Sequence, residues 1–159
     1  MSLRTARSDI RLIAELLTAA EREAHALGDA EPGAEHLLLA ALHGPDASAR
    51  VALAADAAAV RAAIAAVHAD SLTAVGIEAP ALNGASHPVA GVYRSEVSAR
   101  DVFQRARVLS RGSRSGLRTA HVLIAAAERE HGTAALVLQR LGVDRTAVIT
   151  AATSAIAAP

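Results

Sequence analysis

The sequence lacks cysteine, lysine and tryptophan entirely, and it holds only one phenylalanine and one tyrosine. Without cysteine the chain has no disulfide framework, no thiolate nucleophile and no cysteine-ligated zinc site. Without lysine it has no Walker A motif, which excludes a P-loop NTPase of the usual kind. A Schiff-base lysine and a Ser-x-x-Lys nucleophile are excluded for the same reason.

Alanine takes the place of the missing large side chains. It supplies about a quarter of the 159 residues, and apolar residues together make up 52% of the chain. Alanine with leucine, glutamate and arginine is a helix-favouring mixture, so we expect an all-α protein. The N-terminus lacks the apolar run of a signal peptide, and no 18-residue apolar span is free of charges and helix breakers. The sequence therefore favours a cytoplasmic protein without a membrane segment.

The net charge is zero, but the charges are unevenly distributed. Residues 1–80 hold 6 arginines and 11 acidic residues, whereas residues 81–159 hold 10 arginines and 5 acidic residues, so the halves carry −5 and +5. Halves of opposite sign attract each other, or the basic half faces an anionic partner. The sequence leaves both interpretations open.

The most informative feature is an internal repeat at an offset of 85 residues. Residues 32–41 (PGAEHLLLAA) align with residues 117–126 (LRTAHVLIAA), and the same offset continues without a gap from residues 49–53 to residues 134–138. A single unit this small and this rich in alanine buries little apolar surface. We therefore predict two copies that pack together as one pseudo-twofold domain.

Each copy has the pattern of four helices. In the first copy, apolar residues at steps of three and four predict the buried face of the first helix: Ile10, Ile13, Leu17, Ala20, Ala24 and Leu27. Asp56 and Asp144 are expected to cap the last helix of each copy, and Thr119 is expected to cap the helix that carries the second motif.

The remaining helices are expected at about residues 34–43, 46–54 and 57–69, then at 97–111, 120–130, 133–141 and 145–156. Residues 71–95 hold glycine, proline and an Asn-Gly pair and are predicted to be a linker. The first repeat then spans about residues 8–70 and the second about residues 96–157.

Three stretches of the chain carry a family resemblance. Residues 33–39 read GAEHLLL, residues 23–28 read EAHALG, and residues 132–144 read GTAALVLQRLGVD. They resemble, in turn, the G-T-E-H-[IL]-L-L, E-A-x-x-L-G and G-x-A-A-x-x-L-x-x-L-G-V-D patterns of the Clp ATPase N-terminal domain, the substrate- and adaptor-receiving module of ClpA and ClpC unfoldases. The likeness covers about residues 8–157. It implies an all-α domain of two four-helix repeats.

The resemblance implies a binding module with no catalysis and no cofactor of its own. In ClpC-type members the domain binds adaptor proteins, and in some it binds phosphorylated arginine through the glutamate of each T-E-H motif. Only Glu35 keeps that glutamate, because Ala120 stands at the matching position of the second copy. The expected partners are a Clp unfoldase, its substrates or its adaptors. If these residues are a whole gene product, we expect a stand-alone domain that acts as an adaptor or a decoy; if they are part of a longer one, we expect the front end of a larger ATPase.

Glu35 and His36 are the candidate ligand-binding residues, for a phosphoarginine-bearing peptide or a small ligand. A carboxylate pairs with a guanidinium through two charge-assisted hydrogen bonds. The alternative is structural, with Glu35 stabilising the N-terminus of a helix and His36 packing or hydrogen-bonding nearby. His121 repeats His36 where the glutamate is lost, which favours a structural role for both histidines.

The sequence contains no motif for a metal site or for a serine hydrolase. Glu21 and His25 form an i,i+4 pair without a third ligand nearby in sequence, so we expect no metal site. Arg114 stands where a nucleophile elbow requires serine, so we expect no serine hydrolase.

Seven arginines fall between residues 94 and 118, against two acidic residues. Five of them are predicted to form an anion- or partner-binding surface: Arg100, Arg107, Arg111, Arg114 and Arg118. They pair with the acidic first half, or they bind an acidic protein, or they bind nucleic acid. Nucleic acid is the least favoured of the three, because aromatic stacking residues and a recognition-helix pattern are absent.

Overall fold

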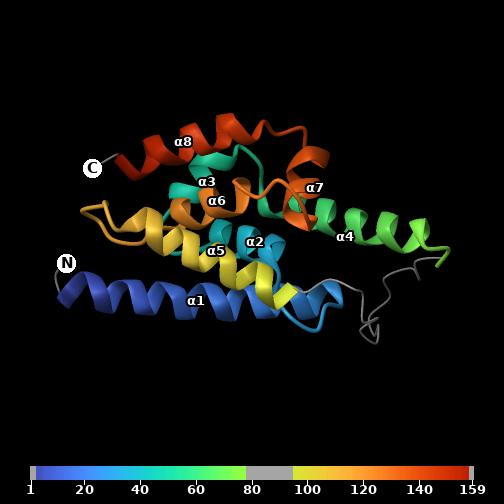
Figure 1. Cartoon of the computed structure of the whole chain (residues 1–159), viewed down its shortest axis with the longest axis horizontal. Coiled ribbons are helices and arrows are strands. Elements are labelled where there is room, and N and C mark those ends of the chain that lie inside the picture. The colour runs from blue at the N-terminus through green and yellow to red at the C-terminus, as the bar shows by residue number, and fades with distance from the viewer. Residues whose placement is uncertain (1–2, 78–94, 158–159) are drawn as a thin grey trace.

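The expected all-α class is confirmed. The computed structural model describes residues 3–77 and 95–157, and these residues contain eight α-helices and no strand (Figure 1). The helices are α1 (Leu3–Leu27), α2 (Ala34–His43), α3 (Ser48–Leu53), α4 (Ala57–Ala74), α5 (Ser95–Ser110), α6 (Thr119–Ala127), α7 (Thr133–Arg140) and α8 (Arg145–Ala157). Among the described residues, no helix is both long enough and apolar enough to cross a membrane.

The helix boundaries differ from the prediction mainly at the start of the first copy and on both sides of the predicted linker. α1 begins at Leu3, ahead of the predicted start of the first repeat at about residue 8. α4 continues to Ala74 and α5 begins at Ser95, so both ends of the predicted linker at 71–95 are helical. The remainder of that linker, residues 78–94, lies outside the described residues.

The buried face of α1 agrees with the predicted one only in part, because Ala20 and Ala24 are buried and Ile13 and Leu27 pack against the core. The residues of α1 that are buried recur every four positions: Leu12, Leu16, Ala20 and Ala24. Two members of the predicted face are exposed, Ile10 at 68% and Leu17 at 36%. α1 packs mainly along α2 (Figure 1), so the contact covers a narrower stripe than the apolar residues occupy.

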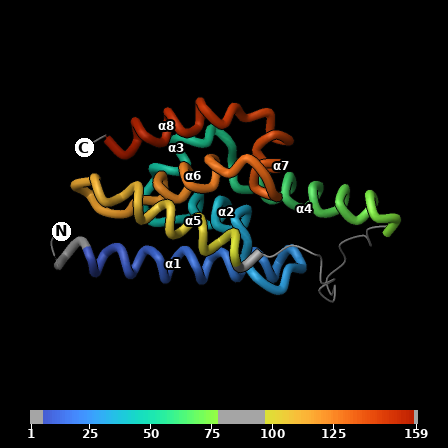
Figure 2. Tube along the Cα trace, in the orientation of Figure 1, coloured from blue at the N-terminus to red at the C-terminus, as the bar shows by residue number. Residues whose placement is uncertain are grey.

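α2 and α6 lie at the centre of the molecule and contact each other. All nine residues of α6 are buried, and so are residues 34–42 of α2. α1 packs on α2, while α5 and α8 pack on α6, so that the central pair is enclosed (Figure 2). A helix that is apolar all round is stable only when other elements cover every face of it.

The buried N-termini of α2 and α6 are capped in the same way. Nδ1 of His36 accepts a hydrogen bond of 3.0 Å from the backbone N–H of Gly33, and Nδ1 of His121 accepts one of 3.0 Å from the backbone N–H of Arg118. Each histidine occupies the third position of its helix, where a side chain can reach back to the N-cap residue. The structural role predicted for these histidines is therefore confirmed, whereas the predicted cap Thr119 belongs to the helix itself.

Thr119 instead joins the two sequence copies. Its backbone N–H donates to Oδ2 of Asp46 at 3.0 Å, and its hydroxyl donates to Oδ1 of the same carboxylate at 2.8 Å. Ser48 in turn accepts a hydrogen bond of 3.0 Å from the backbone N–H of Ala120. Burial by itself raises the pKa of Asp46, but the hydrogen bonds from Ser48 and Thr119 outweigh it and hold that pKa below its ordinary value.

The contact between Thr119 and the first sequence copy is closely packed. A Cβ atom on Gly44 would lie 2.3 Å from Cγ2 of Thr119, so the chain approaches this threonine more closely than a residue with a side chain allows. Thr119 itself is fully buried, and both its backbone N–H and its hydroxyl have hydrogen-bond partners.

We predict that Thr119→Val lowers the free energy of unfolding by roughly 1–3 kcal/mol, because it leaves buried polar partners around Asp46 without their hydrogen bond. Urea denaturation measures the change. Thr153→Val is the matched control: its hydroxyl bonds the backbone of its own helix at an exposed position, so a change within about 0.5 kcal/mol is expected. Equal losses in the two variants would contradict the assigned role of Thr119.

A second prediction concerns pH. Burial lowers the pKa of His121 below the ordinary value of 6.5, so the unfolded chain binds more protons at mildly acidic pH than the folded chain. The stability from neutral His121 is fully present above pH 6.5 and is lost as pH falls from 6.5 toward the lower pKa of the folded state. Thermal unfolding between pH 7.5 and 4.5 should show this loss, and His121→Gln should reduce its slope. The exposed His131→Gln should retain the parent slope; a parent slope in His121→Gln would refute the prediction.

Candidate functional site

Glu35 lies where the sequence places it, in the first turn of α2, but it is buried. Only 7% of the residue is exposed, and its carboxyl group folds back over Gly33. A Cβ atom on Gly33 would lie 2.4 Å from Oε1 of Glu35, so this glycine is what leaves space for the carboxylate. The position of Glu35 therefore depends on a small residue two places before it.

Three further side chains surround this carboxylate, and together we name the four the Glu35 cluster: Asp29, Glu35, His36 and His68. Asp29 follows α1, Glu35 and His36 open α2, and His68 comes from α4. Oδ2 of Asp29 lies 3.2 Å from Nε2 of His36 and 3.5 Å from Nδ1 of His68. Nδ1 of His36 lies 3.3 Å from Oε1 of Glu35.

Sequence reasoning found Glu35 and His36 but missed Asp29 and His68. Asp29 stands in a loop six residues before Glu35, and His68 stands 33 residues after it on a helix that is mostly apolar. No helical or strand period connects such positions. The packing of α4 against α2 brings His68 to the cluster, and no local signal in the sequence predicts that contact.

A carboxylate of α1, that of Glu23, is already paired with an arginine. Glu23 receives hydrogen bonds of 2.7–3.0 Å from the guanidinium of Arg61, and that carboxylate raises the pKa of Arg61. Nε2 of His43 lies 3.7 Å from the same carboxylate. Within the described part of the chain, Asp29 and Glu35 meet imidazoles only and pair with no arginine. The cluster therefore offers negative charge to a cationic ligand.

The second sequence copy has no equivalent of this cluster. Ala120 stands at the position of Glu35. An offset of 88, which pairs the capping residues Asp56 and Asp144, places Ile156 at the position of His68. Only the capping histidine is common to both copies, so the ligand-type chemistry of the Glu35 cluster belongs to the first copy alone.

The predicted arginine surface is only partly open. Arg100, Arg107, Arg111 and Arg114 are exposed along α5 and the loop that follows it. Arg118 is only partly exposed, and its guanidinium donates to the carbonyl of Ala155 at 3.0 Å and lies 3.8 Å from Asp46. Arg118 therefore ties the end of α8 to the first copy, which supports pairing between the basic and acidic halves at this point.

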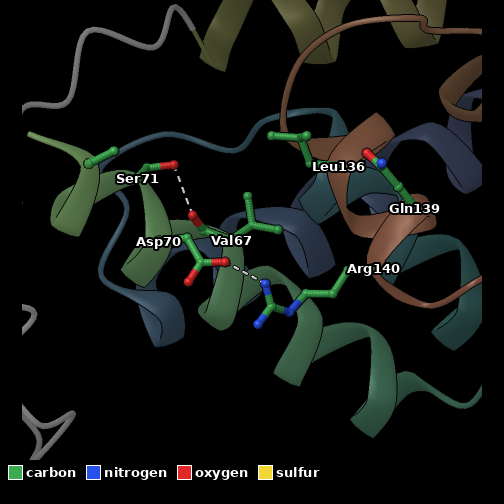
Figure 3. Close-up of a pocket in the computed structure, with 7 residues that line it drawn as sticks. Val67, Asp70, Ser71, Leu136, Gln139 and Arg140 are labelled. Atoms are coloured by element: carbon green, nitrogen blue, oxygen red, sulfur yellow. Dashed lines mark hydrogen bonds and ion pairs between the residues drawn. The ribbon is translucent and has the colours of Figure 1, made fainter.

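A surface hollow of about 470 Å³ lies between α4 and α7. Figure 3 shows Val67, Asp70 and Ser71 on one side of it and Leu136 and Gln139 on the other. Arg140 reaches across to pair with Asp70. The hollow thus combines apolar side chains with hydrogen-bonding groups, and it draws residues from both sequence copies.

No protein-family model matches the chain, and no curated protein matches it at a significant level. The likeness to Clp N-terminal domains consequently rests on the three motifs in the sequence.

Proposed function

We propose that the chain is a non-catalytic protein-binding module, built like the N-terminal domain of Clp unfoldases, that acts as an adaptor or a decoy in Clp-dependent proteolysis. The observation that carries the proposal is the pair of capping histidines. His36 and His121 hold the two most buried helices with the same hydrogen bond at equal length, in motifs 85 residues apart.

The contacts between helices support a pseudo-twofold arrangement. If α1 to α4 are paired with α5 to α8, the contact of α1 with α2 corresponds to that of α5 with α6. The contact of α3 with α8 corresponds in the same way to that of α7 with α4, and α2 and α6 meet at the centre. Such pairing is expected of a duplicated four-helix unit whose copies pack against each other.

The ends of the copies agree in finer detail. The carboxylate of Asp56 accepts from the backbone N–H of Ala59 at 2.6 Å, and that of Asp144 accepts from Ala147 at 2.7 Å. A residue with positive φ stands two places before each cap, Ala54 in the first copy and Gly142 in the second. The same turn therefore leads into α4 and α8, which is a further point in favour of duplication.

The hollow between α4 and α7 is a surface suited to a peptide segment of a partner. Its size falls within the range of known ligand pockets, roughly 300–1,000 Å³. Leu136 is 46% exposed beside it and offers an apolar contact, while the ion pair of Asp70 and Arg140 offers polar ones. Interfaces commonly combine an apolar centre with a polar rim.

The two alternative functions have weaker support. A phosphoarginine receptor uses Glu35, but this carboxylate is buried against Gly33 and is not presented to a peptide at the surface. A nucleic-acid binder uses the arginine surface, and Arg118 is already engaged by α8 and Asp46.

The proposal is tested by a pull-down and by direct affinity measurement with a purified Clp unfoldase, its substrates and its adaptors. We expect one of these proteins to bind, and we expect Leu136→Glu to weaken that binding about tenfold or more by placing a charge in the hollow. Val108→Glu is the matched control, because Val108 is also 46% exposed but lies on α5, away from the hollow.

Absence of binding to all three classes of protein would overturn the proposed function. Equal weakening by Leu136→Glu and Val108→Glu would overturn the assignment of the hollow as the docking surface. Circular dichroism of both variants establishes that the exposed substitutions leave the fold intact.

A further inference from the structure

The Glu35 cluster has the composition of a metal centre. One donor atom from each of Asp29, Glu35 and His68 lies within 4.8 Å of the other two. Two donors on one zinc ion, each at about 2.1 Å, are at most about 4.2 Å apart. Small rotations of these side chains therefore bring all three donors to the distances of a single ion.

A second observation points to a cation ligand at the same place. Oδ2 of Asp29 and Nε2 of His36 are buried and have no hydrogen-bond partner among the described residues, although they lie only 3.2 Å apart. Buried polar atoms are almost always satisfied, because an unsatisfied one costs free energy. A cation bound by Asp29 would satisfy the carboxylate oxygen that the protein itself leaves unpaired.

His36 is fixed in the tautomer that supports such a centre without being a ligand. Because its Nδ1 accepts the N–H of Gly33, its proton is on Nε2, and a protonated nitrogen cannot coordinate a metal. That nitrogen lies 3.2 Å from Oδ2 of Asp29 without the alignment of a hydrogen bond, so His36 is a positioning neighbour of this carboxylate and leaves its oxygen unsatisfied. Outer groups of this kind commonly orient metal ligands.

The donor set favours a metal ion over an organic cation. Two carboxylates and one imidazole suit zinc and similar divalent transition ions, whereas magnesium and calcium take oxygen donors almost exclusively. Glu35 is 7% exposed and lies directly over Gly33, which leaves room for a single ion more readily than for a guanidinium group.

We propose that Asp29, Glu35 and His68 bind one divalent transition-metal ion, with zinc as the representative ion, and that His36 orients Asp29. This departs from the sequence-based expectation of no metal site, because the three ligands come from three separate elements. The inference is independent of the proposed protein-binding function and goes beyond it. It assigns to the first sequence copy a centre that the second copy, with Ala120 in place of Glu35, does not contain.

The test uses the full chain without an affinity tag, stripped with chelator and titrated with zinc chloride by calorimetry. Equilibrium dialysis with elemental detection gives the stoichiometry. We expect one site per chain, weakened about tenfold or more in Glu35→Gln and in His68→Gln. The side chain of His68 is 27% exposed, so His68→Gln tests the proposal even if the buried Glu35→Gln fails to fold.

The matched control is His25→Gln, which removes an exposed histidine with an acidic neighbour, Glu21, one helical turn away. It should keep the parent affinity for zinc. No zinc binding by the parent chain would overturn the proposal, and so would equal zinc affinities in the parent, Glu35→Gln and His68→Gln. Magnesium binding with the affinity of zinc would overturn the assignment to a transition-metal ion.

Discussion

The structure depends on burying two helices, α2 and α6, on every side. A buried helix N-terminus exposes backbone N–H groups that water cannot reach, and the chain must supply partners for them. His36 and His121 each accept a hydrogen bond from the backbone N–H of the N-cap residue of their helix. Asp46 and Ser48 accept hydrogen bonds from the first two N–H groups of α6. The loops before these helices, and the position of Asp46 beside Thr119, follow from this requirement.

The need to bury α2 and α6 on every side also explains why the chain is rich in alanine and poor in aromatic residues. Without tryptophan and with a single phenylalanine, the protein builds its core from leucine, valine, isoleucine and alanine. Small side chains such as Ala40 and Ala125 allow the helices of the centre to approach closely, and dense packing of many small contacts replaces the area that aromatic residues would bury. Gly44 has the same effect at the backbone, because the absence of a side chain lets the chain approach Thr119 closely.

The two sequence copies share the residues that cap their buried helices and differ in the residues next to those caps. Both retain the capping histidine and the aspartate cap of the last helix. Only the first has carboxylates and a second imidazole around its histidine, and only the second places an arginine, Arg118, at the N-cap. The charge difference between the halves is thus partly internal, since Arg118 and Arg140 contact Asp46 and Asp70 of the acidic half.

Local chemistry in the sequence was enough to predict the all-α class and the approximate positions of the helices. Helical periodicity and cap residues act within a few positions of each other, so they are readable without a fold. The exposure of Ile10 and Leu17, the engagement of Arg118 and the meeting of Asp29 with His68 were decided only by tertiary structure. Each depends on which helix faces which, and packing across distant parts of the chain leaves no periodic trace in the sequence.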